Sequence, residues 1–241
     1  MRNPTAIVTG GAKRLGRAMS LSLAERGFDI VIHYNRSKEE ASRLSEEIRG
    51  MGRQCRLLQA DFADLDSVEE TAKKLFSDGE DCQVLINNAS IFNPMLFDKT
   101  PLKDLTNNFS VHFFYPFFLT KFFAEKYAKG VVINILDSRI TDEDIEFFPY
   151  TLSKKSLASF TRMSARALAP DIRVNAICPG PVLPPGFDEP QNMEKKVSRL
   201  PLQKAVAIPD IIRALDYLLD NESVTGEFLF VDGGMHLTNI T

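Results

Sequence analysis

The sequence has few cysteines, no excess of basic charge and no long apolar run, and each absence excludes a class of protein. The three cysteines are far apart and lack the paired spacing of a zinc site. They therefore indicate buried thiols in a reducing compartment, not a disulfide scaffold or a metal site. The formal net charge of −3 provides no basic field that would hold nucleic acid.

Membrane and secreted proteins are also disfavoured. No apolar run approaches the length that crosses a bilayer. The chain enters an apolar strand almost at once, which leaves no room for a signal peptide. We therefore expect a soluble, cytoplasmic protein with no nucleic-acid or membrane partner. With 241 residues, 44% of them hydrophobic and 25% charged, the chain suits one domain with a sizeable core.

Short apolar runs alternate with amphipathic stretches along the whole chain. The apolar runs predict strands at residues 6–9, 30–33, 56–59, 84–87, 131–136, 173–177 and 227–231. The clearest amphipathic stretches predict helices over residues 38–51, 67–76, 149–169 and 209–219. This alternation predicts an α/β fold: a Rossmann-type, doubly wound, seven-stranded parallel sheet with helices on both faces. No linker divides residues 1–241, so we expect a single domain.

The first predicted strand runs into a glycine-rich turn that opens a helix. Gly10, Gly11 and Gly16 let the backbone approach a ligand closely, and Gly16 also lets the helix pack on its strand. Free amides and the positive end of the helix dipole would then bind a phosphate or pyrophosphate. An ordinary tight crossover with three glycines remains the alternative.

The end of the second strand favours one cofactor over another. A carboxylate about 20 residues beyond the glycine turn would bind a ribose 2′-hydroxyl. This sequence instead has Tyr34-Asn35-Arg36-Ser37, with no acid before Glu39. An arginine and a hydroxyl suit a 2′-phosphate, which favours NADPH over NADH. The alternative is a solvated loop followed by a helix cap at Ser37.

Polar residues also follow the third and fourth strands. Asp61 either accepts a hydrogen bond from an adenine amino group or caps the next turn. The fourth strand ends in Asn87-Asn88-Ala89-Ser90, either at the edge where ligands bind or in a turn whose backbone these side chains satisfy. Phe92 follows, and it either stacks on a flat substrate or belongs to the core.

The segment 109–123 is rich in phenylalanine, at positions 109, 113, 114, 117, 118, 122 and 123. These side chains cover too wide an arc for one core-facing stripe, so we expect burial on several sides. Contact between subunits is the favoured reason. A membrane role is disfavoured because the stretch also carries Lys121, Glu125 and Lys126 and is too short to span a bilayer.

Tyr150 and Lys154 lie near the start of a predicted helix and share one of its faces. A free phenol has a pKa near 10, and a nearby ammonium would lower that pKa toward the working range. Asp137 ends the preceding strand, where it would orient the phenol or relay a proton to it. The alternatives are a structural Tyr–Lys pair and an aspartate that pairs with Arg139 or caps a loop.

Taken together, these motifs resemble the short-chain dehydrogenase/reductase family. They are Thr9-Gly10-x-x-x-x-x-Gly16, Asn87-Asn88-Ala89, Tyr150-x-x-x-Lys154, Pro179-Gly180 and Val231-Asp232-Gly233-Gly234, and they extend over nearly the full length. The resemblance implies hydride transfer from a nicotinamide cofactor, a tyrosine acid, and a lysine that also holds the nicotinamide ribose. Family habit further implies a homotetramer, here through the helix of residues 109–123.

Three departures narrow the resemblance. Arg14 replaces the middle glycine of the turn, Asp137 replaces a serine that holds a substrate carbonyl, and His112 replaces the usual helix asparagine of the proton relay. Arg14, Asp137, His33-Tyr34-Asn35-Arg36-Ser37 and Asn88-Ala89-Ser90-Ile91-Phe92 are similar to pteridine reductases. His112, Ile177-Cys178-Pro179 and Asp232-Gly233-Gly234-Met235-His236-Leu237 are closer still to the bacterial dihydromonapterin reductases of that branch.

This branch implies the residues of the site, which includes no metal. The catalytic residues would be Asp137, Tyr150 and Lys154. The substrate-binding residues would be Arg14, Ser90, Phe92, Asp137 and Tyr150, and a flat pterin would lie between Phe92 and the nicotinamide. The cofactor-binding residues would be Gly10, Arg14, Leu15, Gly16, Tyr34, Asn35, Arg36, Ser37, Asp61, Phe62, Asn88, Ala89, Tyr150, Lys154, Pro179 and Gly180. The proline-rich residues 181–200 would form an irregular segment that covers the substrate.

We therefore expect an NADPH-dependent reductase of dihydropterins, with dihydromonapterin, dihydrobiopterin and dihydrofolate as candidate substrates. A carbonyl reductase of 3-oxoacyl thioesters is the first alternative, and Asp137 disfavours it. A catalytically weak NADP-binding regulatory protein is the second, and the intact Tyr150–Lys154 pair disfavours it.

Overall fold

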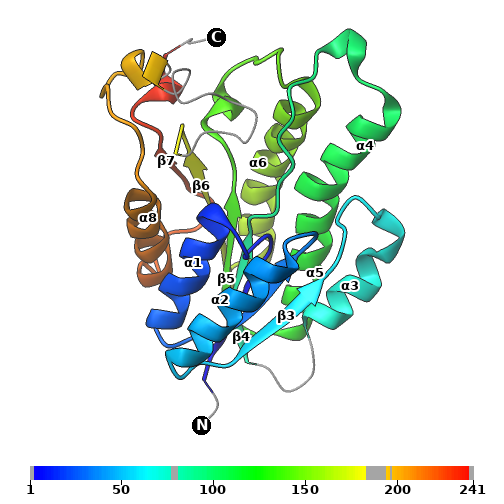
Figure 1. Ribbon diagram of the computed structural model, residues 1–241, viewed down its shortest axis with the longest axis vertical. Coiled ribbons are helices and arrows are strands. Elements are labelled where there is room, and N and C mark those ends of the chain that lie inside the picture. The colour runs from blue at the N-terminus through cyan, green and yellow to red at the C-terminus, as the bar shows by residue number, and fades with distance from the viewer. Residues whose placement is uncertain (1–2, 77–80, 183–193, 196, 239–241) are drawn as a thin grey trace.

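The apolar runs of the chain form one parallel sheet of seven strands (Figure 1). The computed structural model describes residues 3–76, 81–182, 194–195 and 197–238. The strands are β1 (Thr5–Val8), β2 (Asp29–Tyr34), β3 (Cys55–Gln59), β4 (Cys82–Asn87), β5 (Gly130–Ile135), β6 (Ile172–Pro179) and β7 (Phe228–Val231). Their order is β3-β2-β1-β4-β5-β6-β7. The order reverses between β1 and β4, which opens a crevice at their carboxyl ends, where such sheets bind ligands.

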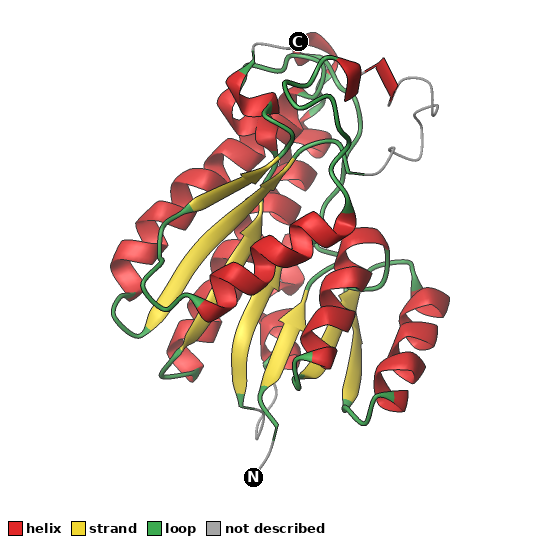
Figure 2. Cartoon of the chain, turned by 90° about the vertical axis from the view of Figure 1, so that its left-hand side faces the viewer, coloured by secondary structure: helices red, strands yellow, loops and turns green. Residues whose placement is uncertain are grey.

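Helices cover both faces of the sheet (Figure 2). The side chains of α1 (Arg14–Glu25), α2 (Lys38–Gly50) and α8 (Ile208–Asp220) pack into the core on one face. Those of α3 (Val68–Leu75), α5 (Tyr115–Lys126) and α6 (Phe148–Leu168) pack on the other, and α4 (Leu102–Phe109) precedes α5. The sheet is therefore the middle layer of three.

The first strand shows why these strands are continuous apolar runs. Ala6 and Val8 face the core beneath α1 and α8, whereas Ile7 faces the core on the opposite side. Alternate side chains of a strand point to opposite faces, and both faces are covered by helices, so no position favours a polar residue. Burial of a large aliphatic side chain contributes about 1.5–3 kcal/mol. The carboxyl edge of the sheet, where ligands bind in such folds, is therefore held by a closely packed core on both faces.

The fold predicted from the sequence is confirmed. Each predicted strand coincides with an observed strand to within two residues at either end. The four predicted helices coincide with α2, α3, α6 and α8 to within one residue. The boundaries agree because apolar periodicity in this chain changes sharply at glycine, proline and polar residues.

The helical segment that includes α4 and α5 is not regular. Between α4 and α5 the backbone forms a π-helical turn over Ser110–Phe114. Pro116 explains the widening, because it has no N–H to donate to the carbonyl of His112, four residues earlier. The wider turn contains His112, whose side chain is completely buried.

The phenylalanines of residues 109–123 are unevenly buried. Phe123 is completely buried, whereas Phe117 is 39% exposed. The rings of Phe113 and Phe117 contact Phe160 of α6, with centroids 6.2 Å and 5.3 Å apart. The described residues of one chain therefore bury only some of these phenylalanines, and the sequence analysis favoured contact between subunits as the reason for burial of the others.

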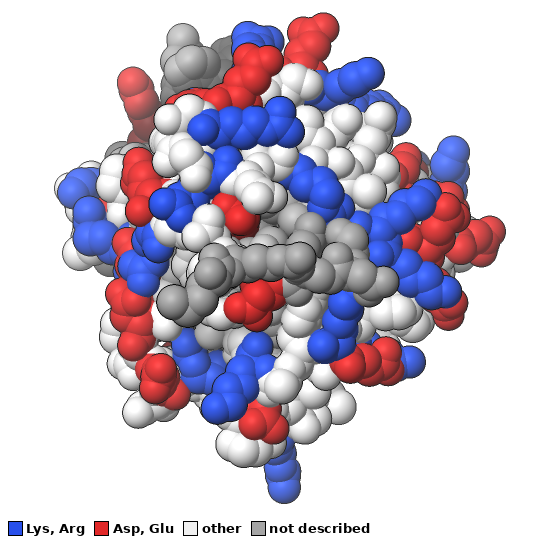
Figure 3. Space-filling model, turned by 90° about the horizontal axis from the view of Figure 1, so that it is seen from below, with Lys and Arg blue, Asp and Glu red and all other residues white. Residues whose placement is uncertain are grey.

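Charged side chains of both signs are spread over the surface. On the face drawn in Figure 3, basic and acidic residues are interspersed. Neither sign of charge therefore dominates the part of this face that the structure describes. Among the helices that the structure describes, none combines the length and apolar character needed to cross a bilayer.

Candidate active site

The crevice at the carboxyl edge of the sheet contains a cavity of about 1230 Å³. Its walls come from the glycine-rich turn, from the loops after β4, β5 and β6, and from the first turns of α6. The cavity is lined by many of the residues predicted for the site: Gly10, Arg14, Leu15, Gly16, Asn88, Ala89, Ser90, Phe92, Asp137, Tyr150, Lys154 and Gly180. The topology thus brings the catalytic, glycine-turn and substrate residues to one place.

The predicted covering segment 181–200 is described only at its two ends. Residues 183–193 and 196 lie outside the described residues. Residues 181–182 and 199–200 line the cavity. The segment therefore starts and ends at the cavity, and its covering role stays a prediction.

Residues predicted to bind the adenosine end of a cofactor lie beyond the cavity wall, after β2 and β3. Asn35 Nδ2 donates a hydrogen bond to Asp61 Oδ1 (3.0 Å), and the amide of Ala63 donates to the same oxygen (3.0 Å). Arg36 is exposed and Ser37 is half-buried. The Asn35–Asp61 bond ties the ends of the two strands together and leaves the Arg36 guanidinium at the surface.

Phe62 differs from the sequence expectation for cofactor binding. Its side chain is buried and stacks on the rings of His33 (3.8 Å between centroids) and Tyr115 (3.9 Å). The ring therefore belongs to the core, and any contact with a cofactor is left to its backbone. Tyr34, which is also buried, and Pro179 do not line the cavity either.

The glycine-rich turn is held by His33, a residue to which the sequence motifs assigned no separate role. The amide of Gly10 donates to His33 Nδ1 (3.2 Å), and the amide of Gly11 donates to the His33 carbonyl (3.0 Å). Since Nδ1 accepts, Nε2 carries the proton and donates to the carbonyl of Ala60 (3.1 Å). Burial lowers the pKa of His33 to about 4, so the imidazole is neutral. These two amides are thus occupied by hydrogen bonds within the protein, so an anion at this turn would have to be bound by amides at the start of α1.

Backbone geometry explains two positions of the turn. Arg14 has a φ of 51°, in the left-handed region where glycine is favoured, and holding another residue there costs about 1–2 kcal/mol. A Cβ on Gly16 would lie 2.1 Å from the Gly10 carbonyl oxygen. Only glycine therefore fits at position 16, whereas position 14 accepts an arginine at a modest cost.

Asn88 braces the turn against β4. Its side-chain Nδ2 donates to the carbonyls of Thr9 (2.9 Å) and Gly10 (3.1 Å). In return, Thr9 Oγ1 accepts the amides of Asn88 (2.8 Å) and Ala89 (3.0 Å). The structure thus supports the alternative in which this asparagine satisfies backbone groups, and the same bonds shape the cavity wall.

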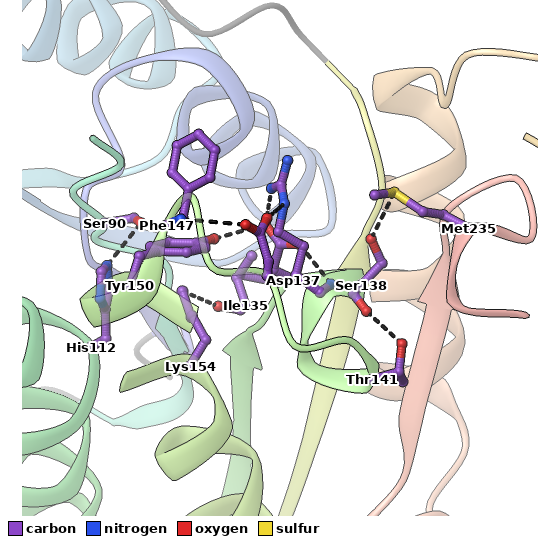
Figure 4. A network of polar contacts seen from close by, with 12 residues as sticks. Ser90, His112, Ile135, Asp137, Ser138, Thr141, Phe147, Tyr150, Lys154 and Met235 are labelled. Carbon is purple, nitrogen blue, oxygen red and sulfur yellow. Dashed lines mark hydrogen bonds and ion pairs between the residues drawn. The ribbon is translucent and has the colours of Figure 1, made fainter. Parts of the chain in front are cut away.

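The predicted catalytic residues lie together (Figure 4). The Tyr150 hydroxyl donates a hydrogen bond to Asp137 Oδ2 (2.8 Å), and Lys154 Nζ donates to the carbonyl of Ile135 (2.7 Å). Asp137 follows β5 by two residues, and the other two side chains come from the first two turns of α6. Asp137 Oδ1 also accepts the amide of Arg139 (2.9 Å), so the loop-capping alternative holds as well.

Burial and the Asp137 carboxylate raise the pKa of Tyr150 well above its ordinary value of 10. This corrects the sequence expectation, in which Lys154 lowers the pKa of the phenol. Burial lowers the pKa of Lys154 itself to about 8, and Nζ lies 5.8 Å from the centroid of the Tyr150 ring. The phenol therefore keeps its proton at neutral pH, so it is present in the form that can donate a proton and not as a base.

An aromatic wall with an arginine beside it forms another side of the cavity. The rings of Phe92 and Phe147 stack, with centroids 4.3 Å apart and planes inclined by 4°. The guanidinium carbon of Arg139 lies 5.1 Å from each centroid, and Arg139 pairs with Asp137 (3.3 Å) and Asp144 (2.8 Å). Phe92 is thus half-buried in the cavity wall, not in the core. Sequence motifs did not indicate Phe147 or the cation over both rings.

The order of these features along the chain is that of one protein family. The sequence profile described as short chain dehydrogenase matches residues 4–195. This chain belongs to the short chain dehydrogenase family. The family resemblance found in the sequence is therefore confirmed, and the chain is an oxidoreductase of that family.

Three proteins similar to this short chain dehydrogenase bear on its class. FolM alternative dihydrofolate reductase 1 from Brucella canis, solved in complex with NADP, is 38% identical with a TM-score of 0.92, covering 99% of this chain and 95% of that one. A blue fluorescent protein from a metagenomic library, solved with NADPH, is 30% identical with a TM-score of 0.88, covering 96% and 97%. The 3-oxoacyl-(acyl-carrier-protein) reductase FabG from Staphylococcus aureus is 27% identical over 97% of this chain and 98% of that protein.

Proposed function

We propose that this short chain dehydrogenase is an NADPH-dependent reductase of dihydropterins such as dihydromonapterin, dihydrobiopterin or dihydrofolate. The observation that carries the proposal is the hydrogen bond from Tyr150 to Asp137 (2.8 Å), in a cavity with Phe92 and Phe147 in its wall. A proton donor held by a carboxylate beside aromatic rings suits a flat nitrogen heterocycle. Similarity to the FolM dihydrofolate reductase supports the same substrate class.

The residues present fit a nicotinamide dinucleotide phosphate. At the start of α1, Gly16 packs so closely on the turn that a Cβ would lie 2.1 Å from the Gly10 carbonyl oxygen, and backbone amides at such a helix start can bind a pyrophosphate. The exposed Arg36 suits a 2′-phosphate. The nearby Asp61 carboxylate accepts a hydrogen bond from the Asn35 side chain. Lys154 is placed to hold a ribose hydroxyl at the cavity floor. When bound, the reduced cofactor supplies a hydride.

Tyr150 supplies the proton that accompanies this hydride. Reduction of a C=N bond adds a hydride to carbon and a proton to nitrogen, so the phenol O–H bond breaks as the N–H bond forms. The Lys154 ammonium, with a pKa of about 8, is largely charged at neutral pH, and we assign it to the ribose hydroxyl and not to the phenol. Asp137 orients the hydroxyl and disfavours the phenolate, so Tyr150 regains a proton from solvent after each turnover.

The remaining contacts would orient the substrate. We assign Phe92 to one face of the heterocycle, and Ser90 and Arg14 to its polar edge, because all three line the cavity with Tyr150. Arg14 also lies at the start of α1, where a cofactor phosphate would bind. The irregular segment 181–200 would cover the substrate from the open side.

The FabG similarity supports an alternative, the reduction of 3-oxoacyl thioesters. Such a substrate must bring a carbonyl oxygen to the Tyr150 hydroxyl. That hydroxyl already points at Asp137, a carboxylate that would repel the oxyanion formed during carbonyl reduction. We therefore favour the pterin, whose nitrogen takes up the proton.

The substrate class can be tested by following NADPH oxidation with a panel of dihydropterins and acetoacetyl thioesters. We expect turnover with at least one of dihydromonapterin, dihydrobiopterin and dihydrofolate, and a higher kcat/KM with NADPH than with NADH because of Arg36. Turnover restricted to the thioesters would support the alternative. An equal rate with NADH would contradict the role of Arg36.

We further propose that residues 1–241 form one NADP-binding reductase domain that acts in the cytoplasm. Every strand that the structure describes belongs to a single sheet, and the site lies at the switch point of that sheet. The described cysteines, at positions 55, 82 and 178, are buried free thiols. Such thiols suit a reducing compartment.

We also propose that the chain forms a homotetramer through the segment of residues 109–123. Phe117 of α5 and Leu152 and Met163 of α6 are 39%, 43% and 71% exposed. The ring of Phe117 contacts Phe160 of α6, so the two helices present a joint apolar face. Faces of this kind are typical of subunit contacts.

Replacing Phe117 with Glu is expected to shift the sedimentation coefficient to that of a smaller assembly, because a charge would be buried in the contact. Met51→Glu is the matched control, because Met51 has the same 39% exposure but lies at the end of α2. Equal sedimentation of both variants and the wild type would contradict the proposed contact.

A further inference from the structure

His112 connects the substrate side of the cavity to the catalytic helix. Its side chain is completely buried, and its ring meets Tyr150 edge-on with centroids 5.2 Å apart. Nε2 lies 3.0 Å from Ser90 Oγ in the loop after β4 (Figure 4). Nδ1 lies 2.9 Å from Ser153 Oγ of α6. One imidazole thus bridges a candidate substrate contact and the helix that carries the proton donor.

Two separate hydrogen bonds assign the same tautomer to this imidazole. The Ser153 hydroxyl donates its proton to the carbonyl of Tyr150 (2.7 Å), so its oxygen must accept from His112 Nδ1. On the other side, the amide of Ile91 donates to Nε2 (3.2 Å), so Nε2 must be without a proton. His112 therefore carries its proton on Nδ1.

The charge state of His112 agrees with these bonds. Burial and the nearby Lys154 charge lower the pKa of His112 well below its ordinary value. A charged imidazolium would also present an Nε2–H to the Ile91 amide, and two donors would face each other. The ring is therefore neutral under the conditions in which the enzyme works.

The same geometry sets the direction of the Ser90 hydroxyl. Ser90 Oγ lies 3.0 Å from the unprotonated Nε2 of His112 and 3.4 Å from the carbonyl of Ile91. Both neighbours are acceptors: the single lone pair of Nε2 is shared between the shorter bond from the Ser90 hydroxyl and the longer bond from the Ile91 amide, so the hydroxyl proton points into the protein. The oxygen lone pairs remain for the cavity, which Ser90 lines with an exposed side chain.

We propose that His112 is a specificity-determining positioning residue that makes Ser90 a hydrogen-bond acceptor and so selects substrates with an N–H donor at that edge. The inference rests on the proposed pterin function, and it names the feature of the substrate that is recognised: an exocyclic amino or ring N–H group. A 3-oxoacyl thioester carries only acceptor oxygens beside its reacting carbon, so Ser90 also disfavours that class.

The tautomer can be measured on the wild-type protein without any ligand. Proton–nitrogen correlation spectra of protein labelled with ¹⁵N-histidine contain three side chains, at positions 33, 112 and 236. We expect a neutral Nδ1–H tautomer for His112, assigned by the signals that disappear in His112→Asn. His33 is the internal control, because its hydrogen bonds require the opposite, Nε2–H form. A protonated Nε2 at His112 would overturn the proposal.

The selectivity can be measured with a 2-amino dihydropterin and its analogue in which hydrogen replaces the amino group. We expect the wild type to favour the amino compound in kcat/KM by about tenfold, which corresponds to about 1.4 kcal/mol. Ser90→Ala and His112→Phe should each bring the ratio near one, and the double variant should lower it no further. Ser156→Ala removes a serine on the exposed side of α6 and should keep the wild-type ratio.

The outcomes separate this inference from the proposed function. Turnover of dihydropterins with an unchanged ratio in Ser90→Ala would overturn the role of Ser90 and leave the function intact. A changed ratio in Ser90→Ala but not in His112→Phe would overturn the role of His112 alone. Absence of turnover with every dihydropterin would overturn both the function and the selectivity.

Discussion

Replacing Tyr150 with Phe is expected to lower kcat roughly a thousandfold, the range typical of losing a general acid. The change removes one oxygen, which donates to Asp137 at 2.8 Å, and leaves the ring. The ring still packs edge-on against Phe92 (4.8 Å) and His112 (5.2 Å), so the cavity keeps its shape. We therefore expect NADPH to bind with unchanged affinity while the chemical step is lost.

The measurement is a single-turnover rate with NADPH and a dihydropterin, together with a fluorescence titration of NADPH. Tyr217→Phe is the matched control, because Tyr217 is 47% exposed on α8 and is not among the described residues that line the cavity. A regulatory protein would keep its NADP-dependent behaviour in the Tyr150 variant. Wild-type turnover in Tyr150→Phe would assign the proton to another donor.

The catalytic residues were predictable because two simple rules apply to them. Tyr150 and Lys154 are four residues apart on a helix, so they share a face, and Asp137 follows a central strand at its carboxyl end. Both rules concern neighbours along the chain or the direction of a strand. Neither requires knowledge of what packs around the group.

Properties that depend on packing were not predictable in the same way. The sequence shows a lysine near Tyr150, but the pKa of the phenol rises because of burial and of Asp137, which only the folded protein determines. Likewise, Arg139 lies over Phe92 and Phe147 because the segment after β4 meets the connection between β5 and α6 there. The spacing of these residues along the chain does not predict that their side chains are in contact.

The glycine-rich turn illustrates both cases. Its position between a strand and a helix could be predicted from the pattern of Gly10, Gly11 and Gly16, whereas its role as an anion site stays a prediction. The partners that hold it could not, because His33 comes from β2 and Asn88 from the end of β4. With the Gly10 amide and carbonyl both bonded, the turn has little freedom to move away from a new side chain.

Replacing Gly16 with Ala is therefore expected to abolish tight binding of NADPH. The new Cβ would lie 2.1 Å from the Gly10 carbonyl oxygen and 2.7 Å from Asn88 Nδ2. The backbone cannot yield without breaking the bonds of Gly10 to His33 (3.2 Å) and Asn88 (3.1 Å). Overpacking of this kind costs about 1–3 kcal/mol of stability. Displaced amides at the start of α1 should weaken NADPH at least about 100-fold, or about 2.7 kcal/mol.

Urea denaturation and NADPH titration measure the two effects, with Gly50→Ala as the matched control. Gly50 is the last residue of α2, and a Cβ there meets no atom within 4 Å. Alanine at position 50 should stabilise the protein by about 0.4–1 kcal/mol, because it reduces the freedom of the unfolded chain. Wild-type NADPH affinity in Gly16→Ala would mean that the cofactor phosphates do not rest on this turn. Loss of affinity with the fold retained would identify the turn as the phosphate site, because the same methyl group at position 50, where it meets no other atom within 4 Å, should leave NADPH affinity unchanged.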